Sequence, residues 1–309
     1  MKHVFGPVPS RRLGLSLGID LVPFKTCSFD CIYCQLGRTT CKTVERREWL
    51  TWEPVLDELR QCLHDGPDYI TFSGSGEPTL HVGLGELIDR VKCTTDVPVA
   101  VLTNGSLLWR QDVRRDLLRA DLVIPSLDVG DECCLRQVNR PHESLSFERI
   151  VEGLIAFGEE YRGAYWLEVL VVAPWTAQLE RVESIAAWTK RIRPDRVQLN
   201  TVTRPPAEAF AEPVPREQLA ELAQLFDPSA EVVDDYGQSP LGERPDFSAD
   251  RILVMLSRRP CTIEDMMAVH GFHRNEVIKQ LDHLSRDGLV ESVAIGSDIY
   301  FRAVRSPRP

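Results

Sequence analysis

The feature that most constrains the fold is a sixfold alternation of short apolar segments with longer amphipathic segments between residues 15 and 226. The apolar segments predict strands at 15–22, 69–73, 97–103, 122–127, 166–172 and 196–202. The amphipathic segments predict helices at 52–63, 84–91, 107–118, 147–157, 179–192 and 216–226. Strands that alternate with helices form a parallel sheet, and six units are too few for a closed eightfold barrel. We therefore predict an α/β fold, an open, partial (β/α)6 barrel.

A second, smaller unit follows a stretch rich in Pro, Gly and Asp at 234–247, which we interpret as a linker. Beyond this stretch, helices are predicted at 249–257, 262–269 and 275–286, and strands at 289–293 and 299–303. Three helices followed by a hairpin indicate a winged helix-turn-helix. The predicted division is a barrel at 1–233, a linker at 234–247 and a winged helix-turn-helix domain at 248–309.

Three of the nine cysteines, Cys27, Cys31 and Cys34, form a C-x3-C-x2-C pattern shortly after the first predicted strand. In an intracellular protein, an odd number of cysteines with three of them clustered favours a metal site over disulfides. Three thiolates from one loop can hold three irons of a [4Fe–4S] cubane and leave the fourth iron open to a ligand. A zinc site with Cys41 as its fourth ligand is the alternative that the spacing leaves open.

Further polar and glycine residues follow the other predicted strands, at the end where barrels of parallel strands carry their sites. Because these strand ends meet at one face of the sheet, we expect the following groups to lie near the cysteines: Gly76-Glu77 after the second strand, Thr103-Asn104 after the third, Ser126 and Asp128 at the fourth, and residues 200–204 at the sixth.

Four residues of these loops are candidate substrate contacts: Asp128, Asn139, Arg140 and Arg204. The guanidinium of Arg204 could hold a carboxylate or phosphate through two parallel hydrogen bonds. The alternative for Asp128, Asn139 and Arg140 is ordinary loop hydrogen bonding or a surface ion pair, and the alternative for Arg204 is a solvated loop arginine. Glu168, inside the fifth predicted strand, needs a polar or cationic partner if it faces inward, because burial of an unpaired carboxylate is costly.

The cysteine loop with Tyr33, together with the turn Ser75-Gly76-Glu77-Pro78, resembles the radical S-adenosylmethionine (SAM) superfamily over about residues 12–205. The resemblance implies a [4Fe–4S] cluster on the three cysteines and SAM on its open iron. It also implies that Tyr33 contacts the adenine and that the turn helps to bind the methionyl amine. Thr103, Asn104 and Ser126 resemble positions that contact the ribose and carboxylate of SAM. The chain departs from the family's Gly-Gly-Glu-Pro pattern at Ser75.

This resemblance implies an enzyme that cleaves SAM reductively to a 5′-deoxyadenosyl radical, which abstracts hydrogen from an unidentified substrate: tRNA, a peptide or a small molecule. It also implies an external one-electron donor of flavodoxin or ferredoxin type. Segments 6–14 and 72–80 are similar to a subgroup related to the wybutosine-pathway tRNA-modifying enzymes, and there is similarity to the molybdopterin-precursor cyclase. No residue is assigned an acid–base role in catalysis.

Charge bears on the expected partners. The net charge is −10, although residues 1–47 hold eight Lys or Arg against three Asp or Glu. Residues 248–309 are nearly balanced, with nine Lys or Arg against eight Asp or Glu, which disfavours duplex DNA as a partner and leaves RNA or peptide capture open. The competing hypothesis is a metal-bearing sensor whose winged domain binds DNA. Because no stretch approaches the ~18 apolar residues of a membrane helix, we expect no membrane association and a cytoplasmic location.

Overall fold

The computed structural model describes residues 3–233, 249–270, 274–295 and 298–304. Its main feature is one eight-stranded sheet in the order β1-β2-β5-β6-β7-β8-β9-β10. All neighbouring strands are parallel except the edge pair β1 and β2. The strands are β1 (Val4–Ser10), β2 (Gly14–Ile19), β5 (Tyr69–Phe72), β6 (Val99–Thr103), β7 (Leu122–Pro125), β8 (Ala164–Val171), β9 (Arg196–Thr201) and β10 (Glu231–Val232).

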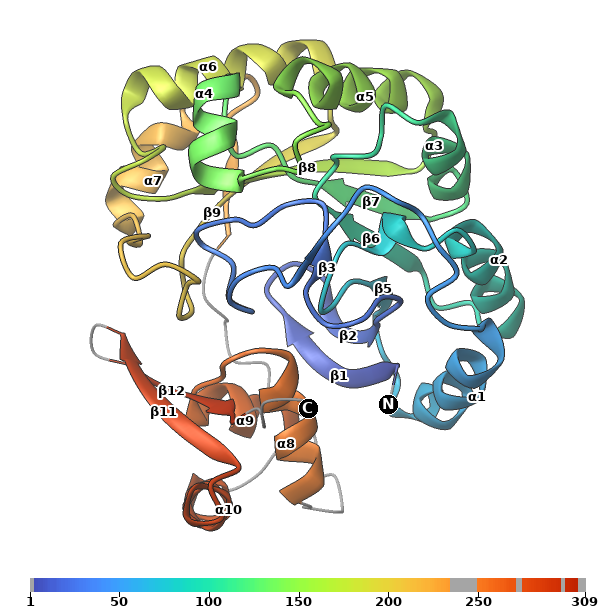
Figure 1. Cartoon of the computed structure of the whole chain (residues 1–309), viewed down its shortest axis with the longest axis vertical. Coiled ribbons are helices and arrows are strands. Elements are labelled where there is room, and N and C mark those ends of the chain that lie inside the picture. The colour runs from blue at the N-terminus through green and yellow to red at the C-terminus, as the bar shows by residue number, and fades with distance from the viewer. Residues whose placement is uncertain (1–2, 234–248, 271–273, 296–297, 305–309) are drawn as a thin grey trace.

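Six helices form an arc around the outside of the strands (Figure 1). They are α1 (Trp52–Cys62), α2 (Leu84–Thr94), α3 (Gln111–Leu117), α5 (Phe147–Glu160), α6 (Leu179–Ile192) and α7 (Arg216–Ala223). Each turns an apolar stripe to the sheet, so that Leu59, Ile88 and Leu154 are fully buried against strand residues such as Val101 and Leu167. The predicted alternation of strands and helices is therefore confirmed. The mostly parallel sheet with helices on its outer face is consistent with an open, partial barrel.

The main correction to the predicted strands is β1, because the sequence predicts no strand before residue 15. Pro7 and Pro9 lack the N–H group that a central strand must donate, which argues against a strand on sequence grounds. In the structure β1 lies at the edge of the sheet and pairs with β2 through an irregular register between Phe5 and Val8. An edge strand tolerates proline because only one of its sides must supply hydrogen bonds.

The turn between β1 and β2 spans the inner face of the sheet. Leu13 packs there with Ala100, Leu122 and Ile124, in a small apolar cluster separate from the helix-facing core. Beside it, the guanidinium of Arg12 lies 2.9 Å from the carboxylate of Glu168 on β8. The turn thus supplies the cationic partner that an inward-facing Glu168 requires. Burial raises the pKa of Glu168, but Arg12 and a hydrogen bond from Asn200 lower it overall.

The described elements after residue 248 form a small unit with its own apolar core, in which Ile252, Met266, Val277 and Leu281 are buried. They are α8 (Ala249–Arg258), α9 (Ile263–His270), α10 (Arg274–Arg286), β11 (Val290–Ile295) and β12 (Asp298–Ala303). Figure 1 shows this unit beside β1, whose Val8 packs against its core. The predicted order of three helices and a hairpin is confirmed. Its identity as a winged helix-turn-helix and the domain boundaries stay predictions, and the whole of the predicted linker, 234–247, lies outside the described residues.

Helix starts in both units follow local capping signals. The hydroxyl of Ser146 accepts a hydrogen bond from the Arg149 amide at the start of α5, as its position predicts. Thr262 and Asp265 exchange two bonds of 3.1 Å between side chains and amides at the start of α9. Within the described ranges, no helix is both long enough and apolar enough to cross a membrane.

Candidate functional site

The cysteine loop leaves β2 and carries two short paired strands, β3 (Thr26–Cys27) and β4 (Cys41–Lys42). Its three thiols are partly exposed. Each sulfur accepts a hydrogen bond from a different side chain: Cys34 from Lys25 at 3.0 Å, Cys27 from Asn104 at 3.4 Å and Cys31 from Asn139 at 3.6 Å. Donors aimed at sulfur stabilise thiolates and tune the reduction potential of a cluster bound to them.

The protonation of these thiols bears on whether they fit a cluster. Burial and then the charge of Glu77 raise the pKa of Cys27 to about 12. Burial and the two neighbouring cysteines raise the pKa of Cys31 well above its ordinary value. A thiol binds iron as its thiolate, so that binding of a cluster would release these protons. Three cysteines on one loop are the donor set that a [4Fe–4S] cluster with one open iron requires.

The arrangement of the thiols fits a cubane better than a single ion. Within the described part of the chain, no three Cys, His, Asp or Glu side chains are placed to hold one metal ion. A cubane does not need such convergence, because each cysteine binds a different iron. Cys41, the fourth ligand of the zinc alternative, is exposed, and its β4 backbone pairs with that of Thr26.

The turn after β5 is joined to the cysteine loop through the backbone. The amide of Lys25 donates to the carbonyl of Ser75 at 2.6 Å, and the amide of Glu77 donates to the carbonyl of Thr26 at 3.0 Å. Between them, a Cβ atom on Gly76 would lie 2.1 Å from the Thr26 carbonyl oxygen, so only glycine fits this position. The predicted turn and the predicted cluster loop are thus one rigid unit.

Glu77 links this unit to the end of β6. Its carboxylate is buried and accepts hydrogen bonds from Thr79, from the Thr103 hydroxyl at 2.6 Å and from the Asn104 amide at 2.8 Å. Burial raises the pKa of Glu77, whereas these bonds oppose the shift. Among the described residues, Oε2 accepts only the Asn104 amide, which leaves capacity for a further cationic donor such as an amine.

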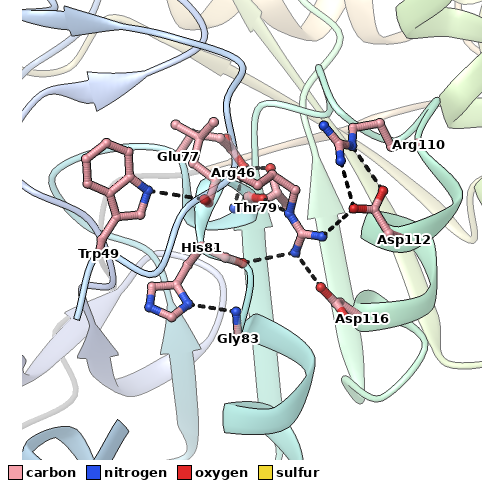
Figure 2. A network of polar contacts seen from close by, with 10 residues as sticks. Arg46, Trp49, Glu77, Thr79, His81, Gly83, Arg110, Asp112 and Asp116 are labelled. Carbon is pink, nitrogen blue, oxygen red and sulfur yellow. Dashed lines mark hydrogen bonds and ion pairs between the residues drawn. The ribbon is translucent and has the colours of Figure 1, made fainter. Parts of the chain in front are cut away.

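Arg46 holds the backbone of the segment after Glu77 in place (Figure 2). It is not among the predicted site residues. Its guanidinium donates to the carbonyls of Thr79 at 2.9 Å and His81 at 3.0 Å, and pairs with Asp112 at 2.8 Å and with Asp116. Only 5 % of its side chain is exposed. This arginine belongs to the basic N-terminal segment, yet it stabilises the interior and is not part of an anion-attracting surface. No local sequence signal distinguishes it from its neighbour Arg47.

A second network surrounds Tyr33. Its hydroxyl donates to the carboxylate of Asp128, which also accepts hydrogen bonds from Asn139 at 2.8 Å and from the Leu170 amide at 2.9 Å. Burial raises the pKa of Asp128 to about 6 despite these bonds. Asn139 also contacts Cys31, and its buried Oδ1 has no hydrogen-bond partner among the described residues. Two candidate substrate contacts therefore lie against the predicted adenine contact and the cluster loop.

The remaining predicted site residues are engaged in other ways. The Ser75 hydroxyl donates to Asp20 at 2.5 Å. Partly exposed Ser126 donates its amide to the Thr103 carbonyl at 3.1 Å. Arg140 pairs with Glu208 at 2.5 Å. Arg204 donates to the Pro260 carbonyl at 3.1 Å and lies 3.8 Å from the Asp265 carboxylate. Arg140 thus forms an ion pair, as its alternative states, whereas Arg204 is only 10 % exposed and is therefore not a solvated loop arginine.

Three comparisons with known proteins bear on the function. The model of the Radical SAM superfamily matches residues 21–177. The UPF0026 protein MJ1312 of Methanocaldococcus jannaschii is 37 % identical, over 91 % of this chain and 86 % of that protein. A Brachyspira hyodysenteriae protein named GTPase Obg is 38 % identical over 94 % of this chain, but the match spans only 43 % of its length.

Among solved structures, a radical SAM methyltransferase from Sphaerobacter thermophilus superposes with a TM-score of 0.54 at 14 % identity. The match covers 70 % of this chain and 64 % of that one. At this identity the likeness supports the fold alone.

Proposed function

This chain belongs to the radical SAM superfamily and is a relative of the UPF0026 proteins, and from this membership we propose that it is an enzyme that binds SAM at the Gly76-Glu77 turn. The cofactors of the family are a [4Fe–4S] cluster and SAM. When bound, they supply reductive cleavage of SAM and a 5′-deoxyadenosyl radical that takes hydrogen from a substrate. The proposal rests on one observation: the Glu77 amide donates a hydrogen bond to the carbonyl of Thr26, the residue directly before Cys27.

The residues of the chain supply binding and orientation. Cys27, Cys31 and Cys34 would hold the cluster. Glu77 would bind the methionyl amine through the free capacity of its carboxylate. The segment Thr103-Asn104 and Ser126 would contact the ribose and carboxylate of SAM, and Tyr33, held in place by Asp128, would contact the adenine.

The proposed substrate is RNA or a peptide presented by the C-terminal unit, as a winged helix-turn-helix would present it. The similarity of segments 6–14 and 72–80 to the subgroup related to the wybutosine-pathway tRNA-modifying enzymes supports this proposal for RNA. Asp128 and Asn139 are the candidate substrate contacts that lie against the site, and Arg140 and Arg204 would contribute only if their present partners were released.

The proposed setting is the reducing cytoplasm, with an external flavodoxin- or ferredoxin-type electron donor. All nine cysteines fall in the described ranges and are free thiols, which suits a reducing compartment. Membership of an enzyme superfamily favours this function over a DNA-binding sensor.

The test is anaerobic reconstitution with iron and sulfide, followed by addition of dithionite and SAM and measurement of 5′-deoxyadenosine. We expect product from the wild type and none from Cys27→Ala, Cys31→Ala or Cys34→Ala. Cys41→Ala is the matched control and should keep both the cluster and the product, whereas the zinc alternative predicts loss of metal. Absence of 5′-deoxyadenosine from wild-type protein with a verified, full cluster would exclude the proposal.

A further inference from the structure

Arg258, the last residue of α8, reaches from the C-terminal unit into the main sheet. Its guanidinium forms an ion pair with the carboxylate of Asp20, the residue that follows β2, and lies 3.2 Å from the hydroxyl of Ser75. The Ser75 hydroxyl itself donates to the same carboxylate oxygen of Asp20 at 2.5 Å. Asp20 and Ser75 are both buried. These three side chains join the C-terminal unit to the turn that precedes Glu77.

Asp20 touches this turn at two points. Besides its bond with Ser75, its carboxyl carbon would lie 2.7 Å from a Cβ atom placed on Gly74, so the turn packs directly on the carboxylate. Gly74 has a φ of 153°, in the region that favours glycine. A shift of the Asp20 carboxylate would therefore displace the backbone that leads to Gly76 and Glu77.

The departure from the family pattern at Ser75 is explained by this contact. A glycine at this position would leave Asp20 without the hydroxyl donor and Arg258 without its second contact. A buried carboxylate that loses a donor or its cationic partner is strongly destabilised in its present place. Ser75 and Arg258 thus act together on one carboxylate, although 183 residues separate them in the chain.

We infer that Arg258 is a positioning residue for SAM, by which the C-terminal unit sets the conformation of the Gly74–Glu77 turn. The inference rests on the proposed function, because it takes this turn as the SAM site. On this inference, the affinity for SAM depends on the position of the C-terminal unit, although that unit supplies no ligand to the cluster. A ligand that moves Arg258 would change the affinity for SAM by some factor. Because the two binding equilibria are linked, SAM would change the affinity for that ligand by the same factor.

Docking of the C-terminal unit does not depend on Arg258 alone. The hydroxyl of Tyr300 donates to the carbonyl of Thr203 at 2.5 Å, and Arg204 donates to the carbonyl of Pro260. These contacts lie after β9, away from the turn in sequence. Tyr300→Phe is therefore a control that weakens docking by one hydrogen bond without touching Asp20 or Ser75.

The experiment compares Arg258→Gln, Arg258→Lys and Tyr300→Phe with the wild type, each with a full cluster. For Arg258→Gln we expect a KM for SAM raised about tenfold, as for other residues that support a ligand-binding group, with little change in kcat for 5′-deoxyadenosine formation. Arg258→Lys should restore most of the affinity, because it keeps the charge beside Asp20. Tyr300→Phe should leave both constants near the wild-type values.

A second readout uses protein without cofactors. Hydrogen–deuterium exchange of the amides at 74–77 should be faster in Arg258→Gln and unchanged in Tyr300→Phe. Unchanged SAM affinity in Arg258→Gln, or an equal loss in Tyr300→Phe, would overturn the inference while the proposed function stands. Wild-type protein that holds a full cluster and binds no SAM would overturn both.

Discussion

The Nζ atom of Lys25 lies 3.0 Å from the Sγ atom of Cys34. Lys25 is 3 % exposed and adopts a φ of 56°, and its amide is bonded to Ser75, so the ammonium group is held at the sulfur by its backbone. A cation that donates to a thiolate ligand stabilises the more negative, reduced state of a cluster. Lys25 would therefore make a cluster bound to this loop easier to reduce.

Replacement of Lys25 should make the cluster harder to reduce. We expect Lys25→Met to lower the reduction potential by on the order of tens of millivolts, through loss of a charged donor to sulfur. The measurement is a redox titration followed by electron paramagnetic resonance. Lys42→Met is the control, because Lys42 donates to the carbonyls of Arg140 and Pro141 and not to sulfur. Equal potentials in the wild type and Lys25→Met would contradict this role.

Glu77→Gln should weaken SAM binding and leave the cluster in place. The substitution removes the charge that would pair with the methionyl amine, and we expect affinity to fall about 10- to 100-fold, the range for groups that hold a ligand in a metal site. Equilibrium binding of SAM and iron content are the two measurements. Glu86→Gln, on the exposed face of α2 beside Arg90, should change neither. Loss of iron in Glu77→Gln would indicate a structural role for Glu77.

The pH dependence of stability should contain a contribution from Asp128. Its pKa is about 6 in the folded protein, against an ordinary value of 3.8, because burial favours the neutral form. The folded state then binds more protons than the unfolded state between these values, so stability falls as pH rises from about 4 to 6. The shift corresponds to about 3 kcal/mol.

Urea unfolding of cluster-free wild type and Asp128→Asn across this range measures that contribution. The wild type should lose up to about 3 kcal/mol relative to the variant as pH rises from 4 to 6, and the difference should be constant above about pH 7. Only the slope tests the prediction, since asparagine also alters the bonds with Tyr33 and Asn139. A difference that does not vary with pH would show that Asp128 titrates normally.

Arg46 should be essential for the stability of the main unit. Arg46→Met leaves Asp116 without its buried partner and the carbonyl of Thr79 without a donor, and removes one of the donors to the His81 carbonyl. We expect the free energy of unfolding to fall by about 3 kcal/mol, the lower end for loss of a partner from a buried ion pair, because Asp112 is half-exposed. The control is Arg60→Met on the exposed face of α1, which should cost less than about 1 kcal/mol. Chemical denaturation measures both, and equal costs would rule out this role.

Local patterns in the sequence determined most of the fold. Apolar periodicity predicts the strands and helices, because the type of each element depends on which face of a short segment is buried. Ser146 and Thr262 mark helix starts, because each hydroxyl accepts a hydrogen bond from the amide three positions further along the chain. The cysteine spacing and the Gly76-Glu77 turn predict the cofactors for the same reason, since each motif lies within a few consecutive residues. The edge strand β1 is missed because its prolines oppose a strand unless the strand lies at an edge, which only the assembled sheet decides.

Only the tertiary structure decided which charged side chains form ion pairs. Arg12 pairs with Glu168 and Arg46 with Asp116, whereas the ion pair that the similar Arg47 forms is with exposed Glu45. Partners far apart in sequence carry no periodic signal, because any basic residue can neutralise any acidic one. The joining of Asp20 to Arg258 across 238 residues is of this kind. The sequence alone predicts a cluster loop and a SAM-binding turn, and the packing of the C-terminal unit decides that Arg258 lies against Asp20 and Ser75 beside that turn.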